Sequence, residues 1–237
     1  MMKKFALLLL WPFLLNAETA VIFAGAGTCE GCASTVAALL QQRNYQVHLV
    51  DEHQLGAEVL RQADLYVQPG GSDDIMDTLS VLSARQIQAI RDFVAQGGSY
   101  LGICAGAYLA GQYADQDAGI RAFGLVELTE IEQELADDNQ AKWIRISVPP
   151  ENRPKQVYYQ AGPHFGRQIP STGKVTAVYA ASKQIAARIS SFGKGKVALI
   201  GPHYEADIDW FTADELPLSF PLQQVLLFQM LQQLQAK

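Results

Sequence analysis

Basic residues are scarce in this chain and are never clustered. Its 18 Lys and Arg residues are outnumbered by 24 Asp and Glu residues, which leaves a net charge of −6 at pH 7. A surface that binds nucleic acid needs concentrated positive charge to meet the phosphates. The sequence therefore argues against nucleic acid as a partner.

Long hydrophobic runs are also absent beyond the first residues. Lys3 and Lys4 precede an apolar run at residues 5–15, and Ala17 follows as a small residue. This layout is typical of a secretory signal peptide cleaved after Ala17, so residues 1–17 are predicted to be removed. A run this short does not span a bilayer comfortably, but an uncleaved anchor is the alternative that the bulky Leu15 leaves open. We expect an exported protein, periplasmic or secreted, with no membrane span after signal removal.

Cysteine is rare, with three residues in the whole chain. In an oxidising compartment Cys29 and Cys32 are close enough in sequence to pair, which leaves Cys104 as a candidate reactive thiol. A Cys-x-x-Cys motif that opens a helix also suits a redox pair or half of a metal site. Because the sequence holds no second cysteine pair and no histidine cluster, we expect no metal. A structural or redox-labile disulfide is favoured over free thiols.

Apolar runs alternate with helical patterns through the first half of the chain. Strands are predicted at residues 19–24, 46–50, 64–67 and 99–103, and helices at 30–42 and 83–95. This alternation is typical of parallel strands joined by helical crossovers. Residues 18–237 are therefore predicted to form a single α/β domain, a three-layer αβα sandwich with a flavodoxin-like, mostly parallel sheet.

The pattern changes after about residue 120. Further strands are predicted at residues 124–131, 143–148, 156–160, 175–180, 185–190 and 196–201, with short turns between them. We expect several of them to pair antiparallel and to extend the central sheet in the C-terminal half. An amphipathic helix is predicted at residues 222–234.

Cys104 stands where a predicted strand runs into a helix-compatible segment at residues 105–111. In a nucleophile elbow the reactive side chain occupies such a tight turn, and its neighbours must be small because the backbone is crowded. Gly102, Ala105 and Gly106 meet that need, and the following helix favours a thiolate at its N-terminus. We predict Cys104 as a nucleophile. An ordinary buried cysteine at a strand end is the alternative.

Two further motifs follow predicted parallel strands. His203 and Glu205 come after residues 196–201, and they can supply the base that a cysteine nucleophile needs and the group that orients that base. Gly70 and Gly71 follow residues 64–67, and amides of such a turn can form an oxyanion hole. Because open α/β sheets place their sites at the carboxyl ends of the strands, we expect these motifs to meet Cys104 there.

In this order and spacing the motifs resemble the class I glutamine amidotransferase superfamily. The segments GGSYLGICAGAYLA (97–110), YYQAGPHF (158–165) and LIGPHYE (199–205) are similar to the amidotransferase-like domain at the N-terminus of some eukaryotic biotin–protein ligases and of stand-alone bacterial proteins. The resemblance spans about residues 20–235. It implies that Cys104 is the nucleophile, His203 the general base and Glu205 its orienter, with the amides of Gly71 and Ala105 as the oxyanion hole.

The chain also departs from this family. Members that hydrolyse glutamine carry Gln four residues after the nucleophile, where this chain has Tyr108, and no synthase partner or ligase module is evident. We therefore predict a cysteine hydrolase or acyl-transfer enzyme for a small amide, ester or peptide, without a cofactor. The alternative is a catalytically inactive ligand-binding module of the same fold.

Two smaller expectations concern residues around the predicted pocket. Gly70, Tyr108 and His164 are candidate pocket residues, although a structural role for His164 is the simpler account. A related peptidase and chaperone branch places a carboxylate after the first strand, a role that only Glu30 could fill here. The His203-x-Glu205 pair argues against that branch.

Overall fold

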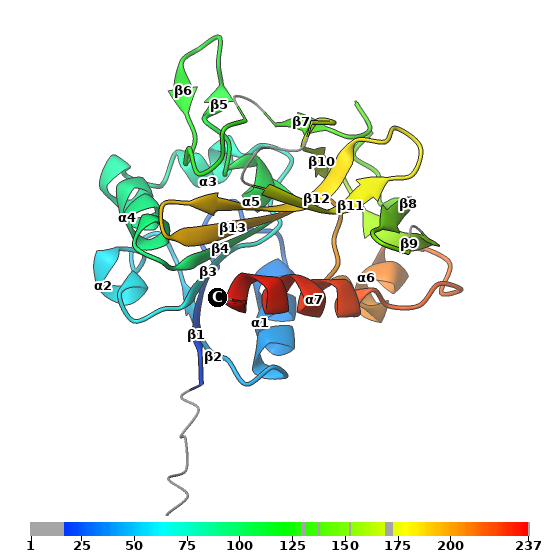
Figure 1. Ribbon diagram of the computed structural model, residues 1–237, viewed down its shortest axis with the longest axis horizontal. Coiled ribbons are helices and arrows are strands. Elements are labelled where there is room, and N and C mark those ends of the chain that lie inside the picture. The colour runs from blue at the N-terminus through cyan, green and yellow to red at the C-terminus, as the bar shows by residue number, and fades with distance from the viewer. Residues whose placement is uncertain (1–16, 129–130, 137, 152, 169–172, 237) are drawn as a thin grey trace, which may run out of the picture.

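The computed structural model describes residues 17–128, 131–136, 138–151, 153–168 and 173–236 (Figure 1). The predicted signal peptide lies outside the described residues except for Ala17. No helix within those ranges is long and apolar enough to cross a membrane.

A nine-stranded sheet forms the centre of the protein, in the order β2-β1-β3-β4-β13-β12-β11-β8-β9. Its first five strands are parallel and follow the 2-1-3-4-5 order of doubly wound, flavodoxin-like sheets. They are β1 (Thr19–Phe23), β2 (Gln46–Val50), β3 (Leu65–Gln68), β4 (Ser99–Ile103) and β13 (Gly195–Ile200).

The sheet continues beyond β13 through four antiparallel strands. They are β12 (Ile185–Phe192), β11 (Gly173–Tyr179), β8 (Lys142–Val148) and β9 (Arg153–Tyr159). The predicted parallel sheet with an antiparallel extension in the C-terminal half is therefore confirmed.

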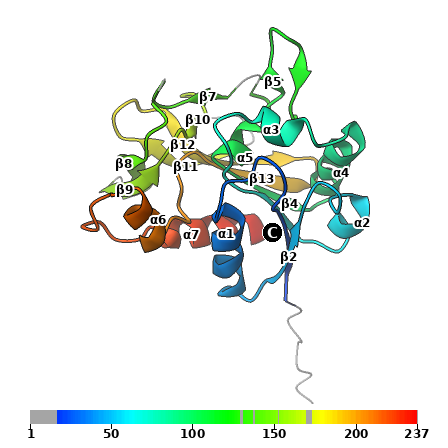
Figure 2. The same cartoon turned by 180° about the vertical axis from the view of Figure 1, so that it is seen from behind.

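Helices cover both faces of this sheet and complete the three layers (Figures 1 and 2). One face packs against α1 (Cys32–Gln41) and α7 (Gln224–Gln235). The other face packs against α2 (Ala57–Leu60), α3 (Met76–Leu79), α4 (Ala84–Ala95) and α5 (Ala105–Tyr108). The remaining elements are α6 (Ile208–Ala213) and two short ribbons, β5 (Tyr113–Asp115) with β6 (Ile120–Arg121) and β7 (Glu132–Gln133) with β10 (Pro163–His164).

Local sequence accounts for much of this arrangement. Along β1, Ala20 and Ile22 face one hydrophobic core while Val21 and Phe23 face the other, as the two-residue period of a strand buried on both faces requires. Ser83 caps α4: its side chain accepts a hydrogen bond from the backbone of Gln86, and the Gln86 side chain accepts one from the backbone of Ser83.

The strand predicted at residues 124–131 is wrong for the part that the structure describes. Gly124 to Leu128 form an irregular segment, and residues 129–130 lie outside the described ranges. Leu125 and Val126 are buried in a core, but both of their amides donate to the carbonyl of Ala110 and not to a sheet ladder. Apolar residues in a buried loop thus imitate the pattern of a strand.

Candidate active site

Cys104 lies in the turn between β4 and α5, in a backbone conformation that only a tight elbow imposes. Its φ of 49° and ψ of −111° are unusual for any residue except glycine, and such strain is typical of functional sites. The turn is packed against β3: a Cβ on Gly106 would lie 1.9 Å from the carbonyl oxygen of Gln68. A Cβ on Gly102 would lie 2.5 Å from the carbonyl oxygen of Gly106. The small residues around Cys104 are therefore required by close backbone packing.

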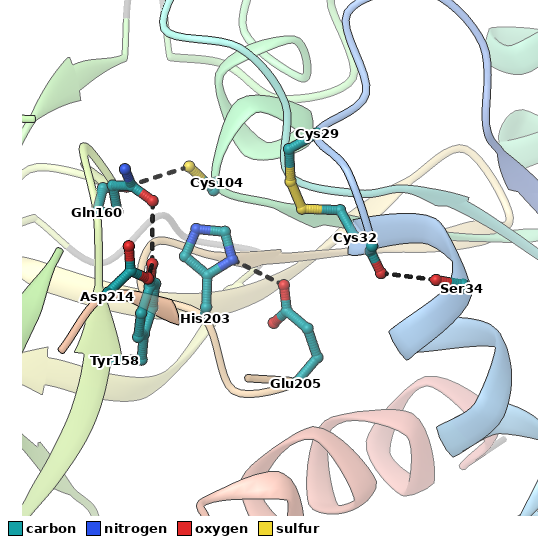
Figure 3. Close-up of a disulfide and its surroundings, with 10 residues drawn as sticks. Cys29, Cys32, Ser34, Cys104, Tyr158, Gln160, His203, Glu205 and Asp214 are labelled. Atoms are coloured by element: carbon teal, nitrogen blue, oxygen red, sulfur yellow. Dashed lines mark hydrogen bonds and ion pairs between the residues drawn. A yellow bond between two sulfur atoms is a disulfide. The ribbon is translucent and has the colours of Figure 1, made fainter. Parts of the chain in front are cut away.

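His203 follows β13 and is held by Glu205 two residues later. The Nδ1 atom of His203 lies 2.8 Å from Oε1 of Glu205, and the two residues are 5% and 0% exposed. The backbone amide of His203 donates to the carbonyl of Tyr158, while the rings of Tyr158 and Trp210 pack against the imidazole. These contacts fix the ring between Cys104 and Glu205 (Figure 3).

Electrostatics favour the protonated form of His203. Burial alone lowers the pKa of the imidazole, but the negative charges of Glu205 and Cys104, and hydrogen bonds to both side chains, outweigh it and raise the pKa to about 10. The site can therefore hold a proton on His203 at neutral pH.

Two backbone amides beside Cys104, those of Gly71 and Ala105, have no hydrogen-bond partner among the described residues. Thr28 and Gly71 form an isolated β-bridge that holds the loop after β3. Its hydrogen bonds run from the amide of Cys29 to the carbonyl of Gly70 and from the amide of Ser72 to the carbonyl of Gly27. A Cβ on Gly71 would lie 3.0 Å from the Cβ of Ala105, so the two residues are adjacent. Both amides are thus free to bind an oxyanion.

A cavity of about 410 Å³ opens in front of the Cys104 sulfur. Its walls come from the loops after β1 and β3, from the elbow, and from the segments around residues 131–133 and 160–161. The lining residues are Cys29, Gly71, Ser72, Asp73, Asp74, Ile75, Cys104, Ala105, Tyr108, Tyr113, Ala114, Ile131, Glu132, Gln133, Gln160, Ala161, His203 and Trp210.

Of the candidate pocket residues, only Tyr108 lines this cavity. Its hydroxyl donates a 2.9 Å hydrogen bond to the carbonyl of Ala161. Gly70 is buried behind the cavity wall, where a Cβ would lie 2.8 Å from Cε1 of His203. His164 lies on β10 and is absent from the lining. Its ring accepts a hydrogen bond from the amide of Gly166 and lies 3.7 Å from Glu132.

Several residues of the site carried no clear signal in the sequence. The Cys104 sulfur lies 3.5 Å from the carbonyl oxygen of Gln160, and the Tyr158 hydroxyl lies 2.7 Å from Asp214 and 3.0 Å from the Gln160 side chain (Figure 3). The segment 158–165 is noticeable only through the family resemblance. Trp210 comes from α6, a short helix without a distinctive motif.

The sulfur atoms of Cys29 and Cys32 are bonded to each other in the structure, with their Cα atoms 5.4 Å apart (Figure 3). Cys104 is the free cysteine of the described residues. Within those residues no group of three or more His, Cys, Asp or Glu side chains could hold a metal ion. Glu30, the carboxylate that follows β1, is exposed and does not line the cavity.

Comparison with known sequences gives a match to one family model and to two curated proteins. Residues 19–130 match the model of the family described as biotin-protein ligase, N terminal. A stretch of 50 residues is 42% identical to cobyric acid synthase from Synechococcus elongatus, and equally to the enzyme of that name from another Synechococcus strain. That stretch is 21% of this chain and spans only a tenth of each curated relative, so it indicates a shared segment and not the whole enzyme.

Solved structures with the same fold cover most of the chain. PurLQS from Thermotoga maritima superposes with a TM-score of 0.63 at 14% identity, over 92% of this chain and 100% of that one. A glutamine amidotransferase from the same organism gives 0.56 at 14% identity over 92% of both chains. Another glutamine amidotransferase structure gives 0.60 at 16% identity, over 78% of this chain and 90% of that one. The protein therefore has the class I glutamine amidotransferase-like fold, and its residues 19–130 match the biotin-protein ligase N-terminal family.

Proposed function

We propose that this protein is a cysteine hydrolase or acyl-transfer enzyme that acts on a small amide, ester or peptide. The observation that supports the proposal is the 2.8 Å contact between His203 and the fully buried carboxylate of Glu205, on an imidazole whose pKa the charge of Cys104 helps to raise. A buried histidine with a merely structural role needs neither an adjacent strained cysteine nor two free amides beside it.

The chemistry follows from these positions. The proton of the Cys104 thiol passes to His203, and the resulting thiolate attacks the carbonyl carbon of the substrate. The amides of Gly71 and Ala105 stabilise the negative charge that develops on the carbonyl oxygen. His203, held by Glu205, then gives its proton to the departing amine or alcohol, and water or another nucleophile releases the acyl group from the sulfur.

The cavity supports a small neutral or cationic substrate. Its lining includes the carboxylates of Asp73, Asp74 and Glu132, and no Lys or Arg is found among the described residues that form it. An anionic substrate would find His203 as its nearest positive group, and that group is engaged by Glu205 and Cys104. Tyr108 narrows the space beside the elbow, which supports a substrate other than glutamine.

Export is part of the proposal. It rests on the basic and apolar residues that precede Ala17, and on the bonded sulfurs of Cys29 and Cys32, which suit an oxidising compartment. The mature protein would act in the periplasm or outside the cell.

Replacement of the nucleophile tests the enzyme proposal. Wild-type protein and Cys104→Ala should be compared on a panel of p-nitrophenyl esters and aminoacyl amides of neutral, cationic and anionic type. We expect the wild type alone to turn over one of the neutral or cationic members, and iodoacetamide to label Cys104 near pH 7. Equal rates for the two proteins, or an unlabelled Cys104, would refute the proposal.

A ligand-binding module without catalysis is the second candidate. Tyr108 favours this candidate, because glutamine-hydrolysing members of the resembled family carry Gln at that position. Its hydroxyl is bound instead to the carbonyl of Ala161 at the cavity wall. A thermal-shift screen of amides and amino-acid derivatives separates the two. A pure binding module keeps the same ligand-induced shift in Cys104→Ser and turns over none of the ligands.

A further inference from the structure

The disulfide between Cys29 and Cys32 borders the same cavity as Cys104. Cys29 is partly exposed and lines the cavity, whereas Cys32 is fully buried as the first residue of α1. Cys29 therefore faces the cavity, whereas Cys32 is shielded by the core. The proposed acyl-transfer chemistry uses neither sulfur.

The disulfide also touches the site through Gly70. A Cβ on Gly70 would lie 2.8 Å from Cε1 of His203, 3.1 Å from the Cys32 sulfur and 3.5 Å from the Cys29 sulfur. Only a glycine allows the disulfide and the imidazole to approach the loop from two sides. The backbone amide of Cys29 donates to the carbonyl of Gly70, so the two loops are joined at this point.

We propose that Cys29 and Cys32 form a redox-active pair that undergoes thiol–disulfide exchange with thiols entering the active-site cavity. This is an activity beyond the proposed acyl transfer and does not depend on it. The sulfur of Cys29, the member of the pair that lines the cavity, is the point of attack. Cys32 is the leaving sulfur, because the N-terminus of the ten-residue helix α1 stabilises a thiolate there.

The exchange balances with thiols as the reductant. A thiolate attacks the sulfur of Cys29, the bond between Cys29 and Cys32 breaks, and its electron pair leaves on Cys32, which takes up a proton. A second thiolate attacks the outer sulfur of the mixed disulfide, the one that came from the first thiol, and Cys29 leaves as a thiolate that takes up a proton. This step releases the oxidised dimer of the thiol. Two thiols are oxidised to one disulfide while the protein disulfide is reduced to two thiols.

Native-state reduction tests this proposal. Folded Cys104→Ser protein, which keeps only the pair, is treated with glutathione or dithiothreitol, quenched with iodoacetamide and weighed by mass spectrometry. We expect reduction in native buffer to proceed at about the rate measured in urea, because attack needs no opening of the fold. Native reduction about 100-fold slower than in urea would overturn the proposal, since that gap marks a disulfide exposed only by opening.

Two matched variants identify the attacked sulfur. In Cys32→Ser combined with Cys104→Ser, glutathione disulfide should add one glutathione to Cys29. In Cys29→Ser combined with Cys104→Ser, the buried Cys32 should stay unmodified over the same time. Equal modification of the two would contradict the assignment, once circular dichroism has shown both variants to be folded.

The variant Cys32→Ser, which keeps Cys104, shows whether the thiol that reacts with Cys29 is Cys104 or a free small-molecule thiol. Mild oxidation that joins Cys29 to Cys104 would show that the chain's own nucleophile reaches the pair, and a glutathione adduct on Cys29 would show that a free thiol does. Either product supports an exchange centre in the cavity. Recovery of Cys29 as an unmodified thiol from both treatments would refute it.

Discussion

The Tyr108 hydroxyl donates a 2.9 Å hydrogen bond to the carbonyl oxygen of Ala161, which joins the helix after the nucleophile to the loop after β9. Ala161 has a φ of 50°, so the loop conformation is one that needs support. Tyr108→Phe keeps the ring and removes the bond. We expect it to lower the free energy of unfolding by about 1 kcal/mol.

Urea denaturation measures this loss, and iodoacetamide labelling of Cys104 serves as the control. Labelling should be unchanged, because the sulfur, His203 and Glu205 keep their positions. A variant as stable as the wild type would show that the bond to Ala161 contributes nothing to folding.

The charge of Glu205 sets the pH range of the proposed enzyme. Burial lowers the pKa of His203, and Glu205 and Cys104 together overcome this and raise it to about 10. On a substrate found in the panel, we expect kcat/KM to fall only as the pH approaches that value. Glu205→Gln removes the negative charge that raises the pKa of His203, so the fall of kcat/KM at high pH should begin at a lower pH. A fall that stays in place would mean that another group controls it.

Stability should also depend on the protonation of His203. The folded protein holds this proton more tightly than the unfolded chain does. The stability that protonated His203 contributes is therefore complete below the ordinary histidine pKa of 6.5, and it is lost as the pH rises towards a pKa of about 10. The free energy of unfolding of wild type minus that of His203→Asn should therefore shrink between these two values. Urea denaturation at several pH values checks this, and a constant difference would contradict it.

Gly106 tolerates no side chain. A Cβ there would lie 1.9 Å from the carbonyl oxygen of Gln68, which is backbone within the central sheet. We expect Gly106→Ala to lower the free energy of unfolding by about 3 kcal/mol or to prevent folding. Gly56→Ala is the matched control, because a Cβ at Gly56 would meet nothing within 4 Å. Thermal unfolding of the two variants should differ clearly, and equal stability would show that the elbow can move away from β3.

The strain at Cys104 can be measured by two inactive variants. Its φ of 49° and ψ of −111° suit glycine better than any residue with a Cβ. Cys104→Gly should therefore be more stable than Cys104→Ala by about 1 kcal/mol, although glycine normally costs stability through its flexible unfolded state. Urea denaturation of both is the measurement. If the alanine variant were the more stable one, the elbow would be unstrained.

Much of the fold was predictable because its signals are local. The alternation in Thr19–Phe23, the capping residue Ser83 and the glycines after α4 act within a few positions of the chain. The irregular segment around Leu125 was not predictable, because a strand and a packed loop can carry the same pattern of buried apolar residues. What decides between them is the partner of the backbone amides, here the carbonyl of Ala110.

The sequence by itself determined the candidate nucleophile Cys104, the His203-x-Glu205 pair and the small residues of the elbow, since each lies in a contiguous motif whose chemistry depends on its neighbours. Only the tertiary structure decided that Cys29 faces the same cavity as Cys104 and that His164 does not line it. These placements arise where the ends of parallel strands far apart in the chain converge at one edge of the sheet. A sequence shows which groups follow each strand, but the approach of two loops depends on packing across strands, which no local pattern records.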